Sequence, residues 1–120
     1  MNPYTYRCTL DRVIDGDTID VHIDLGFNVW LNKQRVRLAG IDTPESRTRN
    51  LDEKALGLAA KARLIQLCTG TLTIISHGRG KYGRILGVPY TAEGQDMCKT
   101  LIEEGHAVEY WGGTKVKVWG

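Results

Sequence analysis

Residues 17–25, DTIDVHIDL, alternate between polar and apolar side chains almost without a break. One face carries the apolar residues Ile19, Val21, Ile23 and Leu25. A period of two predicts a β-strand with one buried face. The preceding residues 5–14, TYRCTLDRVI, predict a second strand, and Asp15-Gly16 between the two is a strong signal for a hairpin turn.

The pattern changes further along the chain. Residues 35–41, RVRLAGI, predict a third strand in which Val36 and Leu38 face away from Arg35 and Arg37. From about residue 52 to residue 68 the apolar period becomes helical. The residues that line one helical face there are Ala55, Leu58, Ala59, Ala62 and Ile65. Asn50 and Glu53 have the spacing of a capping box, and Gly70 is a suitable helix stop.

Two further strands are predicted at 71–77 and 84–90, followed by a turn at 92–95 and a short helix over 96–104. The tail, 114–120, is a weaker candidate for a short strand. This order, with tight turns between strands, argues against a parallel βαβ sheet. It predicts a mainly β chain with helices (α+β), namely a five-stranded OB-fold barrel with two packed helices, in a single domain over 1–120.

Charge and cysteine content limit the partners and the compartment. A net charge of +2 indicates no large basic surface, although several cations gather around three turn-like segments. They are Arg35, Arg37, Arg47, Arg49, Arg79, Lys81 and Arg84. On charge alone, solvated loops and phosphate binding explain these clusters equally well.

The three cysteines, Cys8, Cys68 and Cys98, have neither a metal-ligand spacing nor an even number, so we expect buried thiols in a reducing compartment. The first ten residues, MNPYTYRCTL, contain no apolar export signal, and the longest apolar stretches are too short to span a bilayer. We therefore expect a cytoplasmic protein with no membrane partner.

Acidic residues next to strand ends are the candidates for chemistry. Asp17 has the parity of the buried residues of its strand, which would turn its carboxylate toward the barrel side. A turn aspartate at the strand start is the favoured alternative. In D-T-P-E, residues 42–45, the proline keeps Thr43 extended, so that Asp42, the Thr43 carbonyl and Glu45 can point toward one place. Such oxygens suit Ca²⁺, and a loop with solvated acids is the alternative.

A third motif, K-Y-G-R at 81–84, lies in a glycine-rich loop. Glycines let backbone N–H groups approach an anion, and a neighbouring arginine can bind phosphate with two hydrogen bonds. Taken alone, this motif is better explained as a basic hairpin tip. V-I-D-G-D-T (13–18), D-T-P-E and K-Y-G-R in this order make a far more specific signal. With these motifs, the chain from about Val13 to Ala107 resembles the staphylococcal nuclease (thermonuclease) family.

The resemblance implies a Ca²⁺-dependent endonuclease that cuts DNA and RNA, leaving a 3′-phosphate and a 5′-hydroxyl. It implies that Asp17, Asp42 and the Thr43 carbonyl bind Ca²⁺, and that Glu45 is the general base that holds the attacking water. By the same resemblance, Arg37 and Arg84 clamp the scissile phosphate, and Lys81 and Tyr82 contact a terminal phosphate. A cation and two guanidiniums are what a phosphodiester transition state needs electrostatically. The histidines, His22, His77 and His106, are then structural or surface residues.

Some features differ from the family pattern. Gly80 stands where an acidic residue often precedes K-Y-G-R, and Tyr110 and Trp111 lie near positions where tyrosines stack on the base. For each of the two aromatic residues, a packing role is as good an explanation. The long C-terminal helix of the best-known members is expected to be absent. We expect a monomer that prefers single strands.

Two alternatives to an enzyme remain open at this stage. The first is a non-catalytic single-strand-binding OB-fold module. The second is an interaction domain with a structural Ca²⁺, which would leave Arg37 and Arg84 unexplained.

Overall fold

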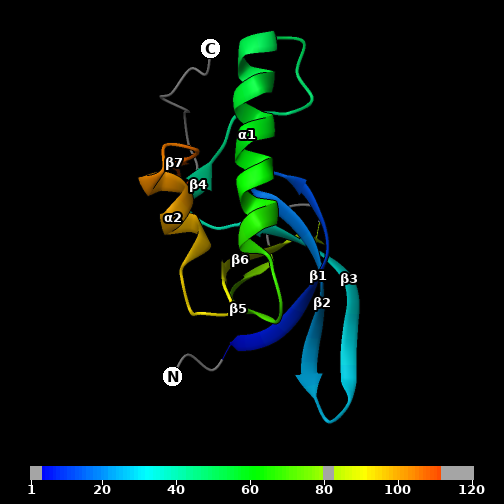
Figure 1. Cartoon of the computed structure of the whole chain (residues 1–120). Helices are drawn as coiled ribbons and strands as arrows, with labels where there is room; N and C mark the ends of the chain where they lie inside the picture. The colour runs from blue at the N-terminus through cyan, green and yellow to red at the C-terminus, as the bar shows by residue number, and fades with distance from the viewer. Residues whose placement is uncertain (1–3, 80–82, 112–120) are drawn as a thin grey trace.

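The fold is a closed barrel with two helices beside it (Figure 1). The computed structural model describes residues 4–79 and 83–111. The barrel strands, in spatial order, are β1 (Thr5–Asp15), β2 (Thr18–Gly26), β3 (Val29–Leu38), β6 (Ile85–Tyr90) and β5 (Leu72–Arg79). All neighbours are antiparallel except β3 and β6, which close the barrel in parallel. The predicted five-stranded, mostly antiparallel OB-type barrel is confirmed.

The alternating stretch forms β2 as predicted, and its apolar face fills the barrel. Ile19 and Val21 are fully buried, and Ile23 is almost so. Leu25 has the same parity but is exposed, because the end of the β2–β3 hairpin extends beyond the barrel. The turn at Asp15-Gly16 is also confirmed, since Asp15 pairs with Thr18 across it.

The third strand is longer than predicted and ends earlier. β3 begins at Val29 rather than at residue 35, and after Leu38 the chain turns at Gly40, whose φ is +78°. The alternation in the first half is broken by a β-bulge, in which Asn32 and Lys33 together lie opposite one residue of β2. The turn leads into a short strand, β4 (Ile41–Asp42), which pairs with β7 (Val108–Glu109).

The first helix, α1 (Leu51–Leu67), starts where the sequence predicts. The side chain of its N-cap, Asn50, accepts a hydrogen bond from the Glu53 N–H, and Gly70 lies just beyond its end. The helical face predicted from the apolar period is, however, the exposed one. The buried residues of α1 are Gly57, Ala60, Leu64 and Leu67. Apolar residues occur on all sides of α1, so their spacing does not show which side packs on the barrel. The packed side is instead the one with small residues, Gly57 and Ala60, at the points of close approach.

The second helix, α2 (Met97–Glu103), is short and lies next to α1. Asp96 caps its start by accepting from the Lys99 N–H, and Gly105 follows its end with a φ of +81°. Across the two helices Arg63 Nε donates to Glu104 at 2.6 Å. Both predicted helices are therefore present. Neither is long and apolar enough to cross a membrane among the residues described.

The three cysteines are buried and free, as expected. Burial is the main cause that raises the pKa of the Cys8, Cys68 and Cys98 thiols to about 12, so they are protonated and chemically quiet at neutral pH. The possible strand at 114–120 and the question of a C-terminal helix lie outside the described residues.

Two leucines of α1 test which helix face packs on the barrel. Leu64→Ala should lower the free energy of unfolding by about 2–5 kcal/mol, because Leu64 is fully buried. Leu58→Ala, the same change at a residue that is 47% exposed, should stay within about 0.5 kcal/mol of the parent. Urea denaturation measures both. Equal losses would mean that the apolar face predicted from the sequence is packed after all.

Candidate active site

Arg37 is the residue on which three chain segments meet. β3 presents it on the outer side of the barrel, because its neighbours Val36 and Leu38 are fully buried inside. Its Nη1 donates to the Leu38 carbonyl at 2.8 Å and its Nη2 to the Ile41 carbonyl at 2.9 Å. The guanidinium thus closes the turn between β3 and β4.

Two carboxylates face the same guanidinium. Asp17 Oδ2 lies 3.5 Å from Arg37 Nη2, and Asp42 Oδ1 lies 4.0 Å from the same nitrogen. Asp17 comes from the β1–β2 turn, where its carbonyl accepts from the Leu38 N–H at 2.8 Å. Asp17 thus lies in the turn and not in β2, which begins at Thr18, so the strand parity that would turn it toward the barrel does not apply. The first two sequence motifs therefore meet at one point on the outside of the barrel.

The D-T-P-E segment packs tightly under α1. Thr43 and Pro44 are buried, whereas Glu45 is exposed. Within residues 4–79 and 83–111, the Thr43 hydroxyl is buried without a hydrogen-bond partner. A Cβ at Gly16 would lie 2.8 Å from the Ala60 Cβ and 3.0 Å from Thr43 Oγ1, so only glycine lets the β1–β2 turn come this close.

Hydrogen bonds from outside the motifs hold this segment in place. Ser46 Oγ donates to Asp15 Oδ1 at 2.8 Å, which ties the end of D-T-P-E to the β1–β2 turn. The backbone N–H of Glu45 donates to Glu53 Oε2 at 3.0 Å. Only half of the predicted capping box forms, because the Glu53 carboxylate binds Glu45 instead of Asn50. The sequence did not single out Asp15, Ser46 or Glu53 for these contacts, although D-G and the capping-box spacing were visible.

Gly57 lets the helix approach Glu45. A Cβ at this position would lie 2.5 Å from the carbonyl carbon and oxygen of Glu45. Glycine in a helix interior costs stability relative to alanine, and here the absence of a side chain permits the contact. Both Gly57 and Glu53 therefore position the backbone of Glu45, while its side chain points into solvent.

Arg84 lies on the same outer face but is not among the residues that contact Asp17 or Asp42. The register Val36↔Ile85 sets Arg84, just before β6, beside Arg35. Its side chain lines a groove together with Asp20, Lys33 and Arg35. Among the residues described, Arg84 has no hydrogen bond or ion pair. The structure thus brings Arg37, Asp17 and Asp42 together and places Arg84 one strand away.

The remaining substrate-binding candidates divide into two groups. Lys81 and Tyr82 lie outside the described residues. The Tyr110 N–H donates to the Gly40 carbonyl at 2.9 Å, and the Trp111 ring covers Gly40, where a Cβ would come within 2.4 Å of it. Trp111 also stacks on His77, with ring centroids 6.4 Å apart. Both aromatic residues therefore lie beside the turn that Arg37 closes.

The oxygen donors at this turn suit a hard cation. The carboxylates of Asp17 and Asp42 both lie within 4.0 Å of Arg37 Nη2, and Thr43 is the next residue after Asp42. Carboxylate and backbone carbonyl oxygens are the ligand types that Ca²⁺ takes. No group of three or more His, Cys, Asp or Glu residues gathers as a metal site in the described part of the chain. The protein oxygens alone would thus leave room for water and phosphate oxygens, since Ca²⁺ takes about six to eight ligands.

Comparison with known proteins identifies the family. The family model described as staphylococcal nuclease homologue matches residues 35–117. The chain belongs to the staphylococcal nuclease homologue family. The match begins inside β3 and includes D-T-P-E, and the contact between Arg37 and Asp17 links it to the earlier V-I-D-G-D-T motif.

Individual relatives of this staphylococcal nuclease homologue include proteins named as nucleases. The chain is 39% identical over 116 residues to micrococcal nuclease of Shigella flexneri, covering 88% of this chain and 59% of that protein. It is 37% identical over 103 residues to endonuclease YncB of Bacillus subtilis (strain 168), covering 82% of this chain and 46% of that protein. A third relative is succinoglycan biosynthesis protein ExoI of Rhizobium meliloti (strain 1021). The chain is 34% identical to it over 103 residues, which cover 81% of this chain and 49% of that protein. The chain spans about half the length of these relatives.

The close approach at Gly57 gives a test of how α1 supports the site in this family member. By helix propensity alone, Gly57→Ala would stabilise α1 by about 1 kcal/mol. We expect the opposite, a loss of about 1–3 kcal/mol, because the new methyl group must displace the Glu45 backbone. Thermal denaturation gives the sign. Ala62→Leu, which adds bulk on the exposed face, is the control and should change stability by less than about 0.5 kcal/mol.

Proposed function

We propose that this chain is a Ca²⁺-dependent endonuclease that hydrolyses phosphodiester bonds of DNA and RNA. The observation that carries the proposal is the Arg37 guanidinium within 4.0 Å of both the Asp17 and the Asp42 carboxylates. Two of the relatives described above are named as nucleases, which supports the same conclusion.

In the proposed site, Asp17, Asp42 and the Thr43 backbone carbonyl hold Ca²⁺. When bound, the ion neutralises charge that develops on the phosphate oxygens. Arg37 donates hydrogen bonds to the scissile phosphate, with its orientation already fixed by the Leu38 and Ile41 carbonyls. Arg84 supplies a second guanidinium from the neighbouring strand.

Glu45 is the proposed general base. Its side chain is exposed while its backbone is held by Glu53 and packed against Gly57, so the carboxylate can meet a water molecule on the solvent side. The carboxylate takes a proton from this water, and the oxygen attacks phosphorus. The bond to the 5′ oxygen then breaks, and that oxygen takes a proton from a solvent water molecule. This step gives a 3′-phosphate and a 5′-hydroxyl.

Four further residues are the proposed substrate contacts. Lys81 and Tyr82 bind a terminal phosphate, and Tyr110 and Trp111 offer rings for base stacking beside the Gly40 turn. A single strand fits this arrangement better than a duplex, because stacking requires an unpaired base. We propose that the chain acts as a monomer.

Cleavage of single-stranded DNA tests the proposal. We expect cutting in Ca²⁺ that stops when a chelator is added. Glu45→Ala should reduce the rate at least about a hundredfold, because the attacking water loses its base. Glu93→Ala is the matched control, since Glu93 is an exposed residue of the turn before α2, and it should cleave like the parent.

The outcome also separates the alternatives. Binding of the strand without Ca²⁺-dependent cutting would refute the enzyme and favour a non-catalytic binding module. Cutting that persists in the chelator would refute the proposed role of Ca²⁺ but not the nuclease.

A further inference from the structure

A groove on the outer face of the barrel extends from Arg84 along β3. It has a volume of about 440 Å³ and is lined by Asp20, Lys33, Arg35, Gly83 and Arg84. None of the contacts at the Arg37 turn uses Lys33 or Arg35. The described lining carries three cations against one carboxylate, which is an arrangement that attracts an anion.

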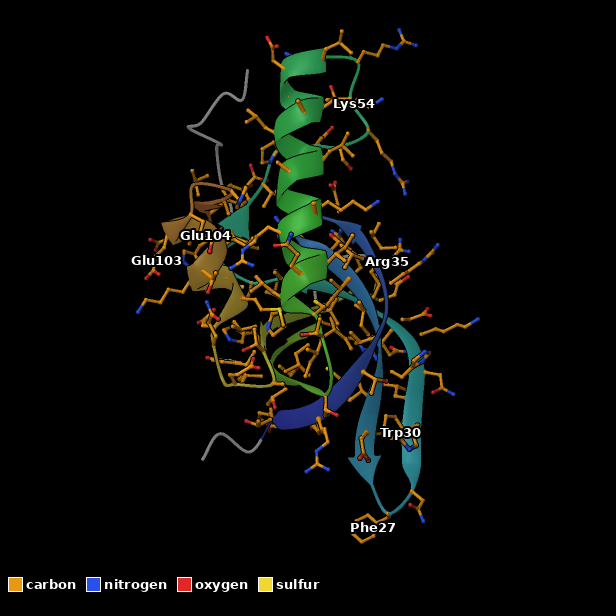
Figure 2. The ribbon with its side chains drawn as sticks, in the orientation of Figure 1. Phe27, Trp30, Arg35, Lys54, Glu103 and Glu104 are labelled. Atoms are coloured by element: carbon orange, nitrogen blue, oxygen red, sulfur yellow. The ribbon has the colours of Figure 1, made fainter. Side chains whose placement is uncertain are left out.

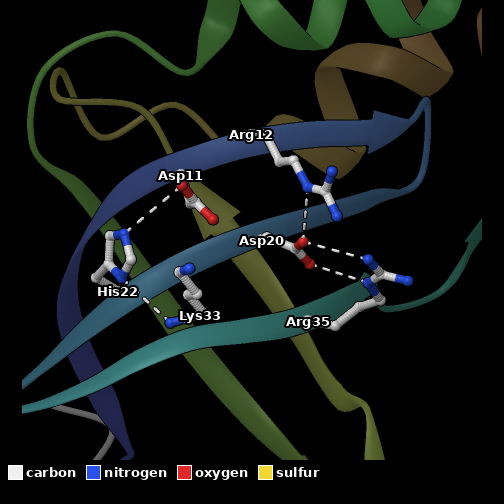
Figure 3. A network of polar contacts seen from close by, with 6 residues as sticks. All are labelled: Asp11, Arg12, Asp20, His22, Lys33 and Arg35. Carbon is white, nitrogen blue, oxygen red and sulfur yellow. Dashed lines mark hydrogen bonds and ion pairs between the residues drawn. The ribbon is translucent and has the colours of Figure 1, made fainter.

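Arg35 is fixed in this groove by a buried acid. Its Nε donates to Asp20 Oδ1 at 2.9 Å and its Nη2 to Oδ2 at 3.2 Å, and Arg12 Nε donates to the same carboxylate at 3.1 Å (Figure 3). The Asp20 side chain is only 10% exposed, whereas that of Arg35 is 44% exposed. In the described structure Arg35 Nη1 makes no hydrogen bond. The acid therefore orients the guanidinium and leaves one of its edges available.

The hydrogen bond from Arg35 is the largest cause that lowers the pKa of Asp20, so the carboxylate stays charged at neutral pH. The Asp20 carboxylate accepts hydrogen bonds from both Arg12 and Arg35, and their positive charges offset the repulsion between this carboxylate and a bound anion. Arg35 is on β3 (Figure 3), the strand whose other end carries the exposed Trp30 at the β2–β3 hairpin (Figure 2).

Lys33 reaches the groove because of the β-bulge. It has a left-handed backbone with φ of +53°, which is uncommon for a residue other than glycine. Its N–H donates to His22 Nδ1 at 3.1 Å, and this contact holds the bulge (Figure 3). Bulges commonly redirect a side chain near functional sites, and a strained residue that the surrounding contacts maintain suggests a function.

The cations also follow one another along β3. Arg37, Arg35 and Lys33 are alternate residues of β3, and residues two apart in a strand are separated by about 6.6–6.8 Å. The β-bulge interrupts the regular strand between Arg35 and Lys33, and Lys33 still lines the groove. Successive phosphates of one nucleic-acid strand can lie along such a row of cations.

We propose that Lys33 and Arg35 form a second phosphate subsite, which binds the backbone of the same nucleic-acid strand beyond the phosphate that Arg37 and Arg84 hold. This inference rests on the proposed function for the identity of the ligand. Because the contacts are to phosphate, the subsite tightens binding without reading the base sequence.

Salt dependence of binding tests the subsite separately from catalysis. Fluorescence anisotropy with a labelled single-stranded DNA oligonucleotide is measured in Ca²⁺, in a Glu45→Gln background that slows cutting. Lys33→Gln and Arg35→Gln should each reduce the slope of log K against log[salt] by about 0.7, the value for one phosphate contact on a single strand. Each should weaken binding about two- to fivefold, to the same extent for strands of different sequence.

The matched control is Arg7→Gln, which removes one charge from an exposed residue of β1 on another part of the barrel and should leave the slope unchanged. Lys33→Gln is the decisive variant if Arg35→Gln folds poorly, because the Lys33 side chain has no ion pair among the residues described. Unchanged slopes in both groove variants, or an equal decrease in Arg7→Gln, would overturn the subsite.

The result is distinguishable from failure of the proposed function. A parent chain that binds with these slope changes but cuts no strand would leave the subsite standing and refute the nuclease. A parent chain that cuts the strand, with unchanged slopes in the groove variants, would support the nuclease and refute the subsite. A parent that neither binds nor cuts would overturn both.

Discussion

The site depends on the Arg37 guanidinium. It contacts the end of β3, the start of β4 and the carboxylates of Asp17 and Asp42. Two acids placed near each other repel, and a fixed arginine between them offsets that repulsion. An arginine with both Nη groups already engaged is also held in one orientation, so it needs little reorganisation when an anion arrives.

Small residues allow the helix to support this arrangement. Gly57 and Ala60 lie where α1 approaches Glu45 and the β1–β2 turn, and larger residues there would push these segments apart. The exposed carboxylate of Glu45 is consequently carried by a backbone that the helix, Glu53 and Ser46 together hold in place. Rigid support beneath an exposed functional group is what a positioned base requires.

The parts of the fold that follow local rules could be predicted from the sequence, and the parts set by distant contacts could not. The alternation in β2 and the Asp15-Gly16 turn predicted the hairpin correctly. The first half of β3 was missed because the bulge at Lys33 breaks the alternation. The family resemblance implied that Asp17 and Asp42 lie close together, but the contacts of Ser46 and Glu53 depend on tertiary packing.

The most direct test of the central claim, that the turn closed by Arg37 is a cation site, is calorimetric titration of Ca²⁺ into the chain. The account predicts one binding site, weakened at least about tenfold in Asp42→Asn. It predicts no change in Asp24→Asn, where the carboxylate accepts a hydrogen bond from the Gly26 N–H at the hairpin end. Absence of Ca²⁺ binding, or equal affinity in Asp42→Asn, would contradict it.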